Sequence, residues 1–274
     1  FISMGAPVPV PSDTFQVLTN LNASKAILIS ANTTSPVSFL NIQNGQLIGP
    51  VRPLNLEDKP ARAAALSPDG SKLLVVAGAN PGVLFVIDLN TETLAPSGRI
   101  QVPLEPRDLV VSADSRLAFV LSIGTPNTLS VVDLATSIVV SQQAVARVSG
   151  SMAISLSPAG SVYVTSQYAL IEFNPLAPYL ERARSGLVTQ PGKLYFSPDG
   201  RYALAKNILG NGSSVIALDL ATKNADYPAG IQVSSAPITT PGSNIPLQVD
   251  ELAVISNTMA IAYVAAVPKM YLVQ

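Results

Sequence analysis

One pattern of residues returns along the chain at intervals of about 45 residues. Each copy has a serine-centred turn, a short apolar run, and then a second apolar run that in most copies ends at Asp or Asn. The turn serines of the later copies lie 45, 45, 40 and 59 residues apart. Four clear copies and two weaker ones occupy residues 66–93, 111–138, 156–178, 196–224, 21–46 and 255–274. A repeat of this length, built from short apolar runs, predicts a fold of stacked repeats.

Each repeat contains four segments of strand length. In the first clear copy these are Arg62–Leu66, Lys72–Ala77, Val83–Leu89 and Arg99–Val102. Turn residues separate them; in Ser67-Pro68-Asp69-Gly70 the proline presets its φ angle and the glycine accepts a positive one. A four-stranded unit of this kind cannot bury both faces alone and must stack on its neighbours. The repeat therefore predicts an all-β fold, a β-propeller whose blades are four-stranded antiparallel sheets.

Six repeats predict a six-bladed propeller, formed by a single domain over residues 1–274. The last repeat has three strand segments, Glu251–Ile255, Met259–Ala265 and Lys269–Val273, and lacks a fourth. The N-terminal segment Ile2–Val10 resembles the outer strands of other repeats, so we expect this strand to complete the last blade. Such closure would remove two exposed sheet edges, which otherwise favour aggregation. A seventh blade would need further chain.

Composition excludes several classes of partner. Charged residues make up 12% of the chain and hydrophobic residues 48%, yet the longest apolar stretches, such as Leu73–Ala77 and Val83–Ile87, have the length of strands. We therefore expect no membrane span. With 16 basic and 17 acidic residues there is no excess of positive charge, so nucleic acid is not an expected partner. The near-neutral charge leaves little repulsion against self-association.

The chain contains no cysteine, histidine or tryptophan. Disulfides, thiolate nucleophiles, zinc–thiolate sites and imidazole bases are therefore excluded. The many uncharged polar residues and few charges favour an extracellular or cell-surface location. The first residues, FISMGAPVPVPS, have no basic segment and no cleavage site, so we expect that a signal peptide has been removed.

The repeat resembles the YVTN-type β-propeller repeat of bacterial and archaeal surface proteins. The resemblance is carried by Ser67–Val76 with Val86–Thr93, by the corresponding segments of the later copies, and by Tyr163-Val164-Thr165-Ser166, one residue from the motif that names the family. It implies a propeller of the superfamily that includes surface-layer components, lactonase-like enzymes and binding modules. It also raises a seven-bladed alternative, because members most often have seven blades.

Two sets of aspartates recur in the repeat, and both are expected to be structural. One set ends the third strands, where an Asp side chain can accept hydrogen bonds from the backbone of the following turn. The other set lies in the turn after the first strand. Members of a set belong to different blades, so they are expected to lie too far apart to chelate a metal. The two sets are Asp88, Asp133 and Asp219, and Asp69, Asp114 and Asp199.

Charged residues also recur at the entrance of the innermost strands, where a propeller has the mouth of its central channel. Loops from every blade converge there, so a ligand site is one interpretation and a hydrated channel lining is the other. Asp250 and Glu251 are neighbours on one strand and would point to opposite faces, which weakens a chelating role. We expect no catalytic residue, no metal and no cofactor. The candidate ligand-binding residues are Arg62, Arg107, Asp108, Lys193, Asp250 and Glu251.

Two further segments are candidate contact surfaces. Lys223–Gln248 contains the surplus length of the fifth repeat and is rich in Pro, Ser and Thr. Pro175–Arg184 brings together Tyr179, Arg182 and Arg184. These features favour a secreted, non-enzymatic scaffold or binding module that presents its loops to a protein or carbohydrate partner. The alternative is a lactonase-like hydrolase or lyase with a site around Arg62, Arg107 and Glu251.

Overall fold

The computed structural model describes residues 8–145, 152–187, 189–208, 214–237, 248–249, 251–264 and 269–273. All regular elements within these ranges are β-strands. No helix in the described ranges is long and apolar enough to cross a membrane. The chain divides into two compact units, Phe1–Val145 and Ala146–Gln274. We describe each unit by itself.

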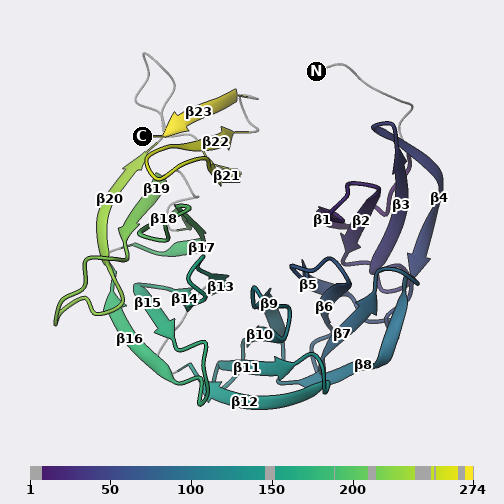
Figure 1. Cartoon of the computed structure of the whole chain (residues 1–274), viewed down its shortest axis with the longest axis horizontal. Coiled ribbons are helices and arrows are strands. Elements are labelled where there is room, and N and C mark those ends of the chain that lie inside the picture. Colours follow the sequence, from purple (N-terminus) through teal and green to yellow (C-terminus); the bar gives the residue numbers. More distant parts are fainter. Residues whose placement is uncertain are drawn as a thin grey trace. The chain divides into compact units, whose positions relative to one another are not determined.

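The first unit contains three four-stranded antiparallel sheets, each made of consecutive strands (Figure 1). The innermost strands of the three sheets are β1, β5 and β9, and the outermost are β4, β8 and β12. Their bounds are β1 Thr14–Thr19, β2 Lys25–Ser30, β3 Val37–Gln43, β4 Gln46–Leu54, β5 Ala61–Leu66, β6 Lys72–Ala77, β7 Gly82–Asp88, β8 Thr93–Val102, β9 Pro106–Val111, β10 Leu117–Ser122, β11 Thr128–Asp133 and β12 Ile138–Ala144.

The second unit repeats this plan with two four-stranded sheets and one three-stranded sheet. Its strands are β13 Ala153–Leu156, β14 Val162–Ser166, β15 Ala169–Phe173, β16 Glu181–Gly186, β17 Pro191–Phe196, β18 Tyr202–Asn207, β19 Ser214–Asp219, β20 Ile231–Pro237, β21 Glu251–Val254, β22 Ala260–Val264 and β23 Lys269–Val273. The five four-stranded sheets and one three-stranded sheet of the described residues confirm the predicted all-β fold of antiparallel blades, and their number agrees with six blades.

The predicted fourth strand of the last blade, Ile2–Val10, lies mostly outside the described residues. Of its described part, Val8 packs against Ala26, Leu28 and Leu40 of the first blade. The pairing of this segment with the last blade, and the single domain over the whole chain, remain predictions.

Two strands differ from the prediction by more than one residue at an end. The outer strand β8 begins at Thr93, earlier than the predicted Arg99, because its pairing with β7 continues past an irregularity in the register. Gly98 lies in this stretch, where an added Cβ atom would meet the Val86 carbonyl oxygen at 2.5 Å. The second difference is β20, which occupies part of the segment predicted to be a surplus loop. Ile231–Pro237 therefore supplies the fourth strand of the fifth blade.

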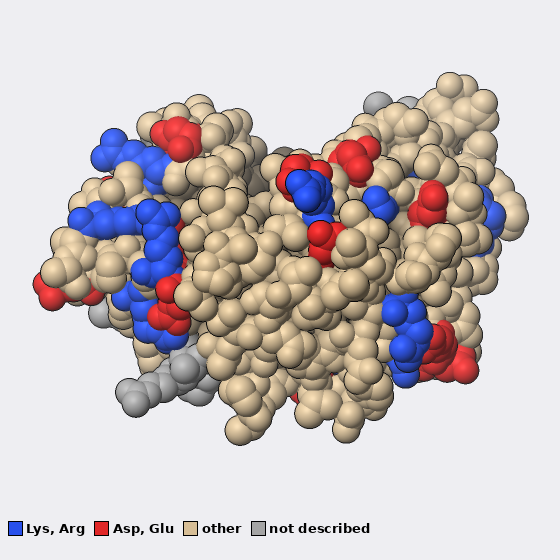
Figure 2. All heavy atoms as spheres, turned by 60° about the horizontal axis from the view of Figure 1, so that its bottom comes forward, with Lys and Arg blue, Asp and Glu red and all other residues tan. Residues whose placement is uncertain are grey.

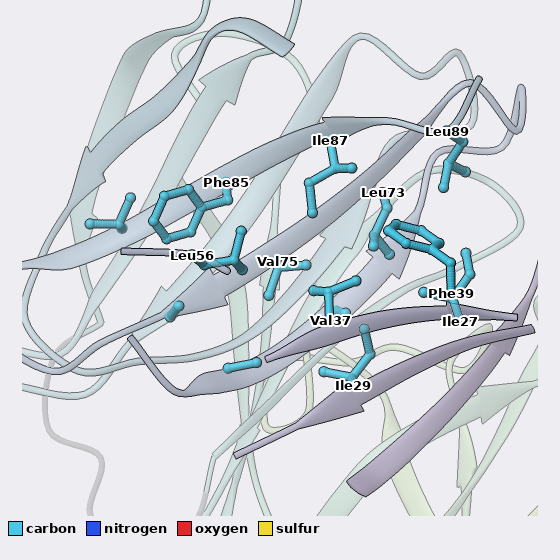
Figure 3. Close-up of a cluster of buried hydrophobic side chains, with 14 residues drawn as sticks. Ile27, Ile29, Val37, Phe39, Leu56, Leu73, Val75, Phe85, Ile87 and Leu89 are labelled. Atoms are coloured by element: carbon cyan, nitrogen blue, oxygen red, sulfur yellow. The ribbon is translucent and has the colours of Figure 1, made fainter. Parts of the chain in front are cut away.

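The blades of the first unit stack through apolar faces. In β6 the side chains alternate, so that Leu73 and Val75 face the first blade while Leu74 and Val76 face the third. Both sets are fully buried, which explains why β6 is apolar at every position after its first. Figure 3 shows the cluster between the first two blades, where Phe85 of β7 lies among aliphatic side chains. This stacking holds the innermost strands side by side and leaves the loops for contacts.

Candidate functional site

The turn aspartates hold the chain reversal between the first and second strands of a blade. The Ser67 hydroxyl donates to Asp69 Oδ1 at 2.5 Å, and the Ser71 backbone N–H donates to the same oxygen at 3.0 Å. Together these hydrogen bonds lower the pKa of Asp69 from its ordinary value of 3.8 to about 2. The serine hydrogen bond is likewise the largest cause of the lowered pKa values of Asp114 and Asp199.

These turns also connect neighbouring blades. In the first unit the Asp69 backbone N–H donates to the Ser115 hydroxyl of the next blade at 3.0 Å. In the second unit the Asp199 N–H donates to Asn257 Oδ1 of the next blade at 3.2 Å. The turn carboxylates therefore have a structural role, as the sequence predicts.

Stability should fall in acid because of these turns. The folded-state pKa of Asp69 is about 2 and its ordinary value is 3.8. The contribution of Asp69 to the free energy of unfolding is therefore present above pH 4 and is lost as the pH falls through about 2. We expect the free energy of unfolding to decrease across this window, and Asp69→Asn to make the decrease shallower. Urea unfolding at a series of pH values measures both slopes. Parallel curves for the two proteins would contradict the assigned role.

The strand-end aspartates cap the turns that follow them. Asp88 Oδ1 accepts the Asn90 N–H at 2.7 Å, and Asp133 Oδ1 accepts the Ala135 N–H at 2.8 Å. Asp219 Oδ1 accepts two backbone N–H groups, each at 3.0 Å. In the part of the chain that the structure describes, no group of three or more carboxylates is arranged to hold a metal ion. The geometry is that of backbone capping.

The candidate ligand residues of the innermost strands fall into two groups. In the first unit, Arg62 of β5 and Arg107 of β9 are exposed and lie on strands in contact. Asp108 is half-buried, and its carboxylate accepts the Leu109 N–H at 2.9 Å. In the second unit, Lys193 of β17 and Glu251 of β21 are exposed.

Asp250 lies outside the described residues. The two groups belong to different units, so a shared ligand site at a channel mouth remains a prediction. On the face in Figure 2, positive and negative side chains form small clusters of both signs on a mostly uncharged surface.

A carboxylate joins the first two blades through an ion pair. Arg52 of β4 donates from Nε and Nη2 to the two oxygens of Glu92, each at 2.9 Å. Lys25 of β2 lies 2.7 Å from the same carboxylate. The hydrogen bond from Arg52 is the largest cause of the lowered pKa of Glu92. Because Glu92 follows β7, this cluster connects the second blade to the first.

A buried carboxylate has the same function between the fourth and fifth blades. The Glu172 side chain on β15 is 2% exposed and is paired with Lys223 Nζ at 2.5 Å. Arg182 Nη1 lies 3.4 Å away, and the Ser161 hydroxyl donates to Oε1 at 3.2 Å. Burial, with a further contribution from Glu172, raises the pKa of the Tyr163 hydroxyl. No local sequence pattern marks Glu172, since it lies within an apolar run.

The predicted aromatic and basic cluster is divided among separate contacts. Arg182 is paired with Glu172, whereas Arg184 forms a two-point ion pair with Glu181 at 2.9 and 2.8 Å. Tyr179 is half-buried in the turn between β15 and β16, with a φ angle of 60°. Both arginines are therefore engaged with carboxylates of their own blade.

A cavity of about 560 Å³ lies in the second unit, beside the start of β20. Four of its residues, Asp226, Tyr227, Ile231 and Gln232, come from the segment Lys223–Gln248 that the sequence predicts to be a contact surface. Tyr227 is the only aromatic residue of that segment, and this is the sequence feature that could have pointed to the cavity. Residues 238–247 of the segment lie outside the described part. Among described residues the cavity is lined by Gly186, Leu187, Asp226, Tyr227, Ile231 and Gln232.

Comparison with known proteins identifies the fold. No family model and no curated protein sequence matches the chain. A functionally unknown protein from Desulfotomaculum acetoxidans is similar in structure, with a TM-score of 0.68, 11% identity, and coverage of 96% of this chain and 86% of that one. The β-propeller domain of Myceliophteria thermophila Cps50 (Swd1) has a TM-score of 0.64 and 13% identity, covering 93% and 81%.

The periplasmic gluconolactonase PpgL of Pseudomonas aeruginosa has a TM-score of 0.60 and 19% identity, covering 83% of this chain and 71% of that one. At these identities the similarity establishes a β-propeller fold alone.

Proposed function

We propose that this protein is a non-enzymatic binding module, a secreted or cell-surface propeller that presents its loops to a protein or carbohydrate partner. The observation that supports this most directly is that the carboxylates of the repeat are engaged in structural contacts. The aspartates of the repeat hold turns, and Glu92 and Glu172 join blades through ion pairs. A chain without histidine or cysteine would need carboxylates for acid–base or metal chemistry.

A lactonase-like activity is the second candidate, favoured by the structural similarity to a periplasmic gluconolactonase. The residues left for such a site are Arg62, Arg107 and Glu251, all exposed. Of these, Glu251 alone could act as a base or bind a metal, and one carboxylate is a weak ligand set. The scaffold function is therefore the better supported of the two.

Titration with divalent cations separates these candidates. With millimolar Ca²⁺, Mg²⁺ or Mn²⁺ we expect the melting temperature to stay unchanged, and we expect no hydrolysis of gluconolactone above the buffer rate. A catalytic metal would stabilise the folded state by mass action and raise the melting temperature by several degrees. Such a rise, or hydrolysis lost in Glu251→Gln but retained in Glu105→Gln, would establish the enzymatic alternative and refute the scaffold.

A further inference from the structure

The loop that carries Tyr227 is held in place by contacts on both sides. At its start, Lys223 is paired with the buried carboxylate of Glu172. Asn224 Oδ1 then accepts the N–H groups of Asp226 and Tyr227 at 3.0 and 2.9 Å. At its end, the buried Ala229 donates its N–H to the Ser185 hydroxyl of β16 at 2.9 Å. Tyr227 and Asp226 are thus presented from an ordered backbone, which reduces the entropy lost on binding.

The side chains around the cavity offer three kinds of contact. Tyr227 is 40% exposed, so part of its ring is open to a ligand. Asp226 is exposed, and within the described part of the chain no cation lies at ion-pair distance from it. Gln232 Oε1 accepts from the Thr189 hydroxyl at 2.8 Å, which leaves the amide nitrogen of Gln232 as a donor. The cavity therefore combines an aromatic face, a strong acceptor and a donor.

We infer that this cavity binds a neutral saccharide, an inference that rests on the proposed binding function and gives it a ligand class and a site. A sugar ring has an apolar C–H face that suits the tyrosine ring, and hydroxyls that both donate and accept hydrogen bonds. Asp226 would accept from one hydroxyl and Gln232 would donate to another. The volume of about 560 Å³ falls within the usual range for small-ligand sites.

Anionic and purely apolar ligands fit these side chains less well. An anionic ligand such as a phosphate or an acidic sugar would meet the carboxylate of Asp226 and be repelled. A purely apolar ligand would desolvate Asp226 and Gln232 without supplying partners, which costs free energy. A neutral ligand rich in hydroxyls avoids both costs.

Isothermal titration calorimetry with cellohexaose, mannohexaose and chitohexaose tests the assignment, with an oligogalacturonate as the anionic probe. We expect at least one neutral hexasaccharide to bind and the oligogalacturonate to bind more weakly. Tyr227→Ala should weaken the neutral probe about tenfold or more, the size of effect typical of an aromatic anchor. Tyr263→Ala is the matched control, because Tyr263 is 39% exposed on a different blade, and it should bind like the parent.

Gly186→Val adds a side chain to the lining of the cavity without a clash with neighbouring atoms. A Cβ atom added at Gly186 meets no atom within 4 Å, and valine is favoured in a strand over glycine. Its melting temperature should therefore equal or exceed that of the parent, while binding of the neutral probe should be weakened. A folded Gly186→Val protein that binds as well as the parent would overturn the assigned site.

The outcomes separate the two proposals. If none of the neutral probes binds and gluconolactone is not hydrolysed, the saccharide assignment fails and the scaffold function stands. If the oligogalacturonate binds better than every neutral probe, the assigned ligand class is wrong. Hydrolysis of any probe refutes the non-enzymatic function itself.

Discussion

Replacing Phe85 with alanine is expected to lower the free energy of unfolding by about 3–5 kcal/mol, the usual cost of removing a fully buried phenylalanine. Its side chain is 1% exposed and lies between the first two blades, among residues such as Val37 and Leu56 (Figure 3). The surrounding strands are hydrogen-bonded on both sides and cannot collapse into the space left by the ring. Equilibrium unfolding in urea measures the loss.

The matched control for Phe85 is Ile138, which lies on the outer strand β12 and is 58% exposed. Ile138→Ala should change the free energy of unfolding by no more than about 0.5 kcal/mol, as surface substitutions usually do. Equal losses in the two variants would show that the packing between blades is not the main source of stability.

Replacing Lys223 with methionine should cost about 2 kcal/mol, less than the cost of breaking a fully buried ion pair, because the Lys223 side chain is 34% exposed. The variant leaves the carboxylate of Glu172 buried, with the mostly exposed Arg182 and Ser161 as its remaining partners. The penalty comes from a buried carboxylate that keeps only these weaker partners, so adding Glu172→Leu should restore most of the stability. The double-mutant cycle, measured by urea unfolding, gives the coupling between the two residues.

Arg184→Met is the control for Lys223→Met, since it removes an ion pair with Glu181 at 2.8 Å that is partly exposed on both sides. Partly exposed pairs contribute about 0–1 kcal/mol, so this variant should be close to the parent. If the double variant of Glu172 and Lys223 is no more stable than Lys223→Met alone, the lost stability comes from packing rather than from charge.

The sequence was sufficient to predict the blades because their signals are local. Ser67-Pro68-Asp69-Gly70 predicts a turn from the φ preferences of Pro and Gly, and Gly70 has a φ angle of 71°. The apolar run Lys72–Ala77 predicts a strand buried on both faces, and the structure has that strand with the same bounds. Propensity and pattern agree at these positions, so no tertiary information is needed.

The contacts that join one blade to the next could not be predicted in the same way. Glu172 and Lys223 are 51 residues apart, and nothing local distinguishes this lysine from one in solvent. The cavity beside Tyr227 likewise depends on the approach of β16 to the loop before β20. The extra length of the fifth repeat predicts a loop at Ile231–Pro237, but the length of a repeat carries no information on strand pairing.

The two ion pairs between blades occupy corresponding places in the repeat with opposite charge. Glu92 and Lys223 each come four residues after the aspartate that ends the third strand, and each contacts the preceding blade. If the fifth blade were placed next to the first, Lys223 would meet Lys25 and Arg52. If the second blade were placed next to the fourth, Glu92 would meet the buried carboxylate of Glu172. Like charges would penalise both arrangements. In a chain built from near-copies of one unit, this reversal of charge disfavours contacts between the wrong repeats while the chain folds.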